Sequence, residues 1–268
     1  MLKAALRPAV WRGRALRDRA ASLVAEPQRR PIVVLGNHKS GTTAVAALLA
    51  AHLETPVQLD MPVLTHDPED GAALERFVRR YAVYFSRPVV KEPWLTLAYA
   101  DLRFILPGAR FVLVVRDPRD TIRSILDRLD LPSNAAGNPP GLADVPRGWR
   151  PMFPSGDDPD APHYIDALAA RWEQIALLPR NAAPAAPEVL RYEDFAADKA
   201  GAVARLAERL GTPGHGAIGH LAARSYQPTG RQRGRPWQTV FGADNLARIE
   251  ATCRNGMAFH GYGASDAA

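Results

Sequence analysis

The segment from residue 32 to residue 43 combines an apolar run, two glycines, a lysine and three hydroxyl side chains in an order that suits phosphate binding. Residues 32–35 predict a buried strand, and Gly36 and Gly41 permit a tight loop after it. Successive N–H groups of such a loop, with the N-terminus of the next helix, bind anions. The loop side chains that add charge or hydroxyl groups are Lys39, Ser40, Thr42 and Thr43.

The spacing of this loop is that of a Walker A loop, with one change. Walker A places its lysine immediately before a Ser or Thr, whereas this sequence has Thr42 in that place and its lysine earlier, at Lys39. An ordinary glycine turn before a helix is the alternative interpretation. The strand, the lysine and the threonine pair together favour the phosphate loop.

A second set of candidate anion-binding residues follows the clearest predicted strand, at residues 111–115. Arg116 ends that strand, an Asp-Pro pair can start the next helix, Ser124 comes eight residues after Arg116, and Arg128 lies one turn further. A planar guanidinium and a hydroxyl group can bind a second phosphate. A surface helix with ordinary arginines is the alternative, but the first loop shifts the balance towards a ligand with two phosphates.

The order of elements predicts an α/β fold, a P-loop-like parallel sheet flanked by helices on both faces in a single domain. Further strands are predicted at residues 57–59, 88–90 and 188–192, and a helix at residues 72–84, so strands and helices alternate. Ligands of such sheets lie beyond the carboxyl ends of the strands. The polar residues expected to converge there are Gly36, Asp60, Lys91 and Arg116.

The run Lys39-Ser40-Gly41-Thr42-Thr43 resembles the 5′-phosphosulfate loop of sulfotransferases that use 3′-phosphoadenosine 5′-phosphosulfate (PAPS). In that family the backbone and a basic residue of the loop hold the 5′-phosphosulfate, so the resemblance implies this role for residues 39–43. Arg116 and Ser124 are similar to the family's 3′-phosphate element, which distinguishes PAPS from ATP. The resemblance runs from about residue 32 to residue 262 and leaves the N-terminal segment and residues 131–162 unmatched.

Two later segments extend the resemblance. Residues 190–195, which contain Tyr192, resemble the segment that follows the last core strand of the family. Residues 231–237 resemble the late basic loop that closes over the cofactor, which implies cofactor binding by Arg231, Arg233 and Gly234. A nucleic-acid-binding patch is the alternative, but this loop has one aromatic residue and no further basic tract.

Sulfuryl transfer is an in-line displacement that needs cations near the leaving phosphate and often a base for the acceptor proton. Lys39 is the first cationic candidate. Lys91 is the second, because its segment resembles the Lys-Asp-Pro element of tyrosylprotein and carbohydrate sulfotransferases, where the lysine is catalytic. Ser225 is a further candidate, because some family members place a serine near the leaving group. A capping or loop serine is the alternative.

Three side chains are candidates for the base, each with a structural role as the alternative. Asp60 comes first, because its distance from the phosphate loop matches the acidic base of tyrosylprotein sulfotransferases. His66 comes second, since histidine titrates near neutral pH. Glu92 comes third and can instead orient Lys91.

Composition sets outer bounds on the interpretation. The chain has 268 residues, a formal net charge of +6 and one cysteine, Cys253, which excludes an intramolecular disulfide and fits a reducing compartment, so we expect a cytoplasmic protein. No apolar run approaches the roughly 20 residues that cross a bilayer. The Ala-, Arg- and Pro-rich composition favours a bacterium with a GC-rich genome.

The chain divides into a basic N-terminal helical segment, residues 1–30, and a sulfotransferase-like domain, residues 31–268. The N-terminal helix can touch an anionic membrane surface weakly, or simply pack on the domain. Residues 131–162, rich in Pro, Gly, Asn and Asp, form a long loop. A substrate-covering lid and a disordered insert are both open for it.

The sequence therefore predicts an enzyme that moves the sulfuryl group of PAPS to a hydroxyl or amine of an acceptor, without a metal and without nucleic acid as a partner. Small-molecule, glycan, lipid and peptide acceptors all remain open. A P-loop kinase or NTPase that uses ATP and Mg²⁺, and a non-catalytic nucleotide-binding protein, are the alternatives.

Overall fold

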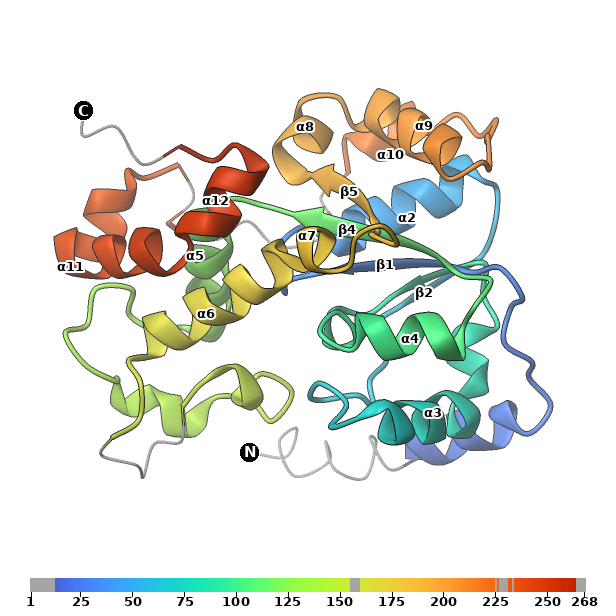
Figure 1. The fold of residues 1–268 in the computed structure, drawn as a ribbon, viewed down its shortest axis with the longest axis horizontal. Coiled ribbons are helices and arrows are strands. Elements are labelled where there is room, and N and C mark those ends of the chain that lie inside the picture. The colour runs from blue at the N-terminus through green and yellow to red at the C-terminus, as the bar shows by residue number, and fades with distance from the viewer. Residues whose placement is uncertain (1–12, 155–159, 225, 227–230, 233, 264–268) are drawn as a thin grey trace.

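The structure, a computed structural model, describes residues 13–154, 160–224, 226, 231–232 and 234–263. Its core is a five-stranded parallel sheet with the strand order β2-β3-β1-β4-β5 (Figure 1). The strands are β1 (Ile32–Gly36), β2 (Val57–Leu59), β3 (Val89–Lys91), β4 (Arg110–Val115) and β5 (Glu188–Arg191).

Strand β1 lies at the centre of the sheet, between β3 and β4. All five of its residues are buried, because helices cover both faces of the sheet, and this burial explains the continuous apolar run in the sequence. Gly36 is paired with Val114 of β4, and Val34 is paired with Lys91 of β3. This register brings the loops that follow β1, β3 and β4 to one edge of the sheet.

One helix layer packs on the face of the sheet formed by Ile32, Val34, Val112 and Val114. Helix α2 (Thr42–His52) contributes Val45 to this layer, and its neighbour α9 contacts it. Figure 1 shows the helices of this layer on the same side of the sheet. They are α2, α8 (Tyr192–Ala197), α9 (Lys199–Arg209) and α10 (Gly219–Ala222).

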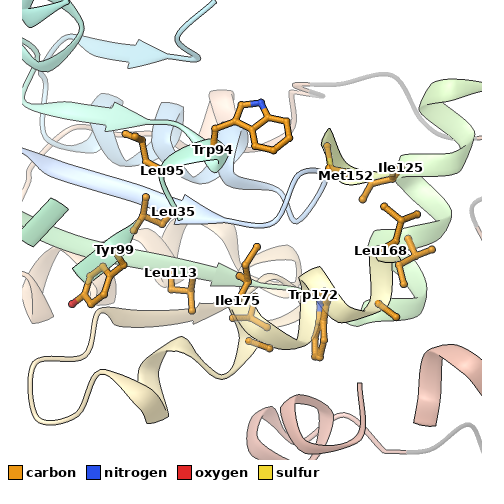
Figure 2. Close-up of a cluster of buried hydrophobic side chains, with 14 of the residues drawn as sticks. Leu35, Trp94, Leu95, Tyr99, Leu113, Ile125, Met152, Leu168, Trp172 and Ile175 are labelled. Carbon is orange, nitrogen blue, oxygen red and sulfur yellow. The ribbon is translucent and has the colours of Figure 1, made fainter. Parts of the chain in front are cut away.

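The other layer packs on the opposite face, around Leu35 of β1 and Leu113 of β4. Figure 2 shows these two side chains with Ile175 and Trp172 of α6, which belong to the same core cluster. The helices of the layer are α3 (Gly71–Arg80), α4 (Tyr99–Ile105), α5 (Pro118–Leu129), α6 (Tyr164–Ala176), α7 (Leu178–Asn181), α11 (Trp237–Thr252) and α12 (Arg254–His260). A parallel sheet with helices on both faces is the predicted fold class, which is confirmed.

Two predicted boundaries differ from the structure. The last strand ends at Arg191 rather than at residue 192, because Tyr192 already begins α8. The helix predicted at residues 72–84 is divided: α3 ends at Arg80, and the 3₁₀ helix η1 (Ala82–Phe85) follows it.

The described part of the long loop, residues 131–154 and 160–162, contains two short 3₁₀ helices, η3 (Pro140–Asp144) and η4 (Arg150–Met152). Leu142 and Met152 are buried in the larger core cluster, and Figure 2 shows Met152 beside Ile125 of α5. The hydroxyl of Tyr164 donates to the carbonyl of Pro132 at 2.7 Å. These contacts attach the described part of the loop to the domain.

The described part of the N-terminal segment is helical over residues 13–22 and packs on η1. The hydroxyl of Tyr84 donates to the buried carboxylate of Asp18 at 2.6 Å, and the N–H of Val83 donates to Ser22 Oγ at 3.2 Å. Within the described residues, no helix has the length and apolar character to cross a membrane. The segment's expected membrane contact stays a prediction.

Candidate active site

The loop between β1 and α2 takes a path that depends on its glycines. Gly36 has φ 144°, and a Cβ there would lie 2.5 Å from the carbonyl oxygen of Val114. Gly41 has φ 96° and caps the N-terminus of α2, where a Cβ would lie 2.3 Å from Cδ2 of Tyr192. Lys39 between them also adopts a left-handed conformation, with φ 69°. Only glycine fits the first two positions without displacement of its neighbours.

Hydrogen bonds hold the base of this loop in place. The N–H of Gly36 donates to Thr96 Oγ1 at 3.0 Å, and this hydroxyl donates back to the Gly36 carbonyl at 3.1 Å. Ser40 Oγ donates to the carbonyl of Asn37 at 2.7 Å, so its hydroxyl group serves the loop itself. Thr42 is buried and Thr43 is half-buried at the first turn of α2. The predicted phosphate loop thus has the strand-loop-helix context that anion binding needs.

Arg116, which follows β4, contacts this loop. The register of the sheet brings the two together, because Gly36 is paired with Val114. Its Nη1 donates to the carbonyl of Lys39 at 3.1 Å, and its Nη2 lies 3.4 Å from Asp120 Oδ2. The guanidinium lies 4.6 Å from the ring centroid of Tyr192, and its backbone carbonyl accepts a hydrogen bond from Trp172 Nε1 at 2.9 Å. Arg116 is therefore held from several sides before any ligand binds.

Positive charge gathers around the loop. Burial lowers the pKa of Lys39, and repulsion from Arg128 and then Arg116 lowers it further, whereas Asp127 acts in the opposite direction. Ser124 is half-buried and Arg128 exposed, both on α5. An anion bound among these cations would relieve their repulsion, so the charges favour a negatively charged ligand.

Buried polar atoms without partners also favour a negatively charged ligand. Within the described residues, Nε of Arg116 and both side-chain polar atoms of Asn37 are buried without a hydrogen-bond partner. Buried polar groups are normally paired, so the two unpaired donors, Nε of Arg116 and Nδ2 of Asn37, suit a ligand that carries acceptor oxygens. The residues present therefore fit an anionic ligand such as a phosphate.

The late basic loop docks on α5. Arg231 forms an ion pair with Asp130, directly after the helix, and the N–H of Gln232 donates to Asp127 Oδ2 at 3.1 Å. Gly234 has φ 81°. Trp237 Nε1 donates to Asp120 Oδ1 at 3.1 Å. Two predicted site residues of this region, Ser225 and Arg233, lie outside the described residues.

Lys91 and Asp60, predicted from different strand ends, form an ion pair at the carboxyl edge of the sheet. The side chain of Lys91 is 5% exposed, whereas that of Asp60 is 62% exposed. Asp60 takes a left-handed conformation with φ 59°, and its N–H donates to the carbonyl of Lys91 at 3.1 Å. The structure therefore brings these two candidates together and fixes their backbones to one another.

Glu92, the third candidate base, is buried beneath this pair. Its Oε2 accepts from the N–H of Met61 at 2.7 Å, and its Oε1 accepts from the N–H of Trp94 at 3.1 Å. Burial raises its pKa to about 7, against the opposing effects of Lys91 and the two N–H groups. This arrangement holds Met61, next to Asp60, and Trp94, three residues after Lys91, and it matches the orienting role considered for Glu92.

His66 lies on an exposed segment after β2, and its Nδ1 is 3.3 Å from Thr65 Oγ1. None of the hydrogen bonds or ring contacts described for it reaches the phosphate loop, Lys91 or Asp60. Another histidine, His38, lies on the loop itself, one residue before Lys39, and packs against two tryptophans. Its ring centroid lies 4.6 Å from that of Trp94 and 5.2 Å from that of Trp149.

Sequence reasoning missed this aromatic group and the arginine beside it. Arg171 of α6 lies 4.8 Å from the Trp94 ring and binds Asp67 through both Nη atoms, at 2.9 Å for Nη2. The residues come from the phosphate loop, η2 (Pro93–Leu95), the long loop and α6, and no local pattern links them. A histidine inside a phosphate loop was the one signal that could have drawn attention to the group.

No protein-family model matches the chain, and no curated protein sequence matches it. Several solved structures match it. The sulfotransferase STF9 from Mycobacterium avium matches with a TM-score of 0.51 at 12% identity, over 91% of this chain and 80% of that one. Two further matches are a sulfotransferase from Alicyclobacillus acidocaldarius (TM-score 0.45, 18% identity, 86% and 97% covered) and mouse sulfotransferase SULT7A1 complexed with PAP (0.49, 12%, 89% and 91%).

At these identities the likeness concerns the fold. The match with STF9 covers 91% of this chain. The chain has the sulfotransferase fold, which confirms the fold that the sequence motifs implied.

Proposed function

We propose that this protein is a sulfotransferase that moves the sulfuryl group of PAPS to a hydroxyl or amine of an acceptor and releases 3′-phosphoadenosine 5′-phosphate (PAP). The observation that carries the proposal is the group of cations Lys39, Arg116 and Arg128 around a glycine-dependent loop, where burial first and then the charges of Arg128 and Arg116 lower the pKa of Lys39. A ligand with several negative charges would offset the positive charge of these three side chains.

The 5′-phosphosulfate binds at the N-terminus of α2. The N–H groups of residues 41–43 donate to its oxygens, and the ammonium group of Lys39 and the hydroxyl groups of Thr42 and Thr43 add to them. Ser40 shapes the loop, because its N–H and its hydroxyl both donate to the carbonyl of Asn37, at 3.2 and 2.7 Å.

The 3′-phosphate binds between the end of β4 and α5. Arg116 supplies a guanidinium that is already oriented by Lys39 and Tyr192, and Ser124 supplies a hydroxyl group. Arg128 adds charge from the next turn of α5. The docked position of Arg231 on α5 supports the late basic loop, with Arg233 and Gly234, as the cover of this side of the nucleotide.

In the reaction, the acceptor oxygen or nitrogen attacks sulfur while the bond between sulfur and the 5′-phosphate oxygen breaks. Negative charge develops on that phosphate oxygen, and cations held nearby stabilise it. Lys39 and Lys91 supply this charge. Asp60 holds the ammonium group of Lys91, and Glu92 holds the backbone N–H groups of Met61, next to Asp60, and of Trp94.

An ATP- and Mg²⁺-dependent reaction is less well supported. Thr42 stands at the Walker lysine position, and Arg116 rather than an acidic residue follows β4. The acceptor can be a small molecule, a glycan, a lipid or a peptide, because acceptor pockets vary on one fold.

Calorimetric titration with PAP, beside ATP with and without Mg²⁺, tests the proposal. We expect saturable, metal-independent binding of PAP with a Kd of roughly micromolar or below, and much weaker binding of ATP. Metal-dependent ATP binding with no response to PAP would replace the proposal with the kinase hypothesis. Binding to RNA or DNA that PAP does not displace would replace it with a nucleic-acid adaptor.

A further inference from the structure

His38 occupies an unusual position for an ionisable side chain. It lies on the phosphate loop, directly before Lys39, and its ring packs edge-on against Trp94 and at a tilt against Trp149. These tryptophans come from the turn after β3 and from the long loop. The phosphate loop, the turn after β3 and the long loop thus meet around one imidazole. Lys91 lies close enough to affect its charge.

One nitrogen of this ring is unsatisfied. Nδ1 is buried, and the described residues provide no hydrogen-bond partner for it. The residue as a whole is half-buried, so part of it remains accessible. Because Nδ1 is buried and Nε2 is not among the buried unpaired atoms, Nε2 is the ring nitrogen that we assign to contact with an acceptor molecule.

The surroundings keep the ring neutral. Burial lowers the pKa of His38 well below its ordinary value, and the charges of Arg171 and Lys91 lower it further. Asp67 holds the guanidinium of Arg171 in place through both of its Nη atoms. A neutral imidazole has one nitrogen with a lone pair, which is the form that accepts a proton.

The other candidate bases are engaged elsewhere. Asp60 has an oxygen committed to Lys91, and both oxygens of Glu92 accept backbone N–H groups. His66 is exposed and hydrogen-bonds with its neighbour Thr65. Of the candidate side chains that the structure describes, His38 is the one on the phosphate loop itself.

We propose that His38 is a catalytic base that accepts the proton of the attacking hydroxyl group, an inference that rests on the sulfotransferase function proposed above. As the acceptor O–H bond breaks, its oxygen forms a bond to sulfur and its proton passes to Nε2. The bond between sulfur and the 5′-phosphate breaks, and its electron pair stays on the released PAP. The imidazolium then gives its proton to solvent.

The two indoles orient the ring, and the position of Trp149 gives the long loop a part in the reaction. Burial first, and then the two cations Arg171 and Lys91, oppose protonation of the imidazole in the free protein. The phosphosulfate anion offsets their charge when it binds, so the basicity of His38 rises when the proton must be accepted.

Water is the simplest hydroxyl acceptor and needs no knowledge of the natural one. The experiment measures PAP released from PAPS under single-turnover conditions by anion-exchange chromatography, for the intact chain, His38→Ala and His38→Gln. His220→Ala, at an exposed histidine on α10, is the matched control. Calorimetry with PAP on every variant reports whether the nucleotide site is intact.

We expect the intact chain to release PAP faster than a protein-free solution. Both His38 variants should lose roughly 100-fold in rate, within the range typical of a general base, while the affinity for PAP stays within a few-fold. Added imidazole should restore activity to His38→Ala, because this variant leaves a ring-shaped space between the indoles. His220→Ala should behave as the intact chain does.

Three results would overturn the inference: an intact chain no faster than the blank, a His38→Ala rate equal to that of the intact chain, or a loss that imidazole does not restore although PAP still binds. Absence of PAP binding by the intact chain is a different failure. It would remove the proposed function itself, and calorimetry separates the two cases.

Discussion

The guanidinium of Arg116 lies over the ring of Tyr192, 4.6 Å from its centroid, and the same ring packs against Gly41 at the start of α2. Arg116 also donates to the carbonyl of Lys39. One aromatic side chain therefore sets the distance between the two proposed phosphate sites. The affinity for a ligand with phosphates on the 3′ and 5′ positions of one ribose would depend directly on this distance.

Arg116→Ala should weaken PAP much more than adenosine 5′-phosphate, because the two ligands differ only in the 3′-phosphate. We expect the affinity for PAP to fall roughly 100-fold, the size of a lost charge-assisted contact. Calorimetric titration of both ligands measures the difference. Arg205→Ala, an exposed change on α9 with the same effect on net charge, is the control. An equal loss for both ligands would show that Arg116 does not bind the 3′-phosphate.

Tyr192→Leu should lower the affinity for PAP about tenfold, because the guanidinium of Arg116 loses the ring that holds it. Tyr192→Phe keeps the ring and should retain most of the affinity. Fluorescence or calorimetric titration of PAP compares the two variants. If Tyr192→Phe loses as much as Tyr192→Leu, the hydroxyl group contributes through a direct contact instead.

The sequence predicted those parts of the fold and site that depend on local pattern. Residues 32–35 and 111–115 are buried strands and therefore read as apolar runs. The glycines at 36 and 41 and the arginine at 116 follow strand ends, where parallel sheets bind ligands. Lys91 and Asp60 also follow strand ends, and the structure joins them in an ion pair.

Other parts of the site depend on tertiary packing that no local pattern records. His38 gains its environment from Trp94, Trp149 and Arg171, which lie 56 to 133 positions further along the chain. His66 was a candidate because of its residue type, but its exposed position gives it no described contact with the loop. The residue types predicted which side chains could act as a base, whereas their burial and contacts in the folded protein decide which of them can do so.

Gly41→Ala should destabilise the protein more than Gly211→Ala does. Both glycines have positive φ, 96° and 62°, but a Cβ at Gly211 meets open space, whereas one at Gly41 lies 2.3 Å from the Tyr192 ring. Gly211→Ala should cost about 1 kcal/mol in the free energy of unfolding through backbone strain alone. Urea denaturation of both variants tests the order, and adding Tyr192→Ala to Gly41→Ala should recover part of the extra cost. Equal costs for the two glycine variants would contradict the close packing on Gly41.

Asp60→Asn should lower turnover of PAPS while the affinity for PAP changes little. The change removes the carboxylate that holds the ammonium group of Lys91, but it leaves the phosphate loop untouched. Roughly tenfold or more is expected for a displaced cation at the leaving group. Single-turnover PAP release, with His66→Ala alongside, provides the measurement. A loss in His66→Ala with none in Asp60→Asn would show that turnover depends on His66 and not on the ion pair of Asp60 with Lys91.

The stability of the protein should depend on pH through Glu92. Burial raises its pKa in the folded protein from 4.5 to about 7, so between these values the folded state binds the proton more tightly than the unfolded chain does. Stability associated with this group is therefore lost as pH rises from about 4.5 to about 7 and changes little above that, by about 3 kcal/mol in all. Glu92→Gln cannot titrate, and it should be less stable at low pH because one N–H of Met61 or Trp94 loses its acceptor. Urea denaturation of both proteins between pH 5 and pH 8 gives the difference in the free energy of unfolding, which should shrink as pH rises. A difference that stays constant across this range would mean that Glu92 titrates in the folded protein as it does in the unfolded chain.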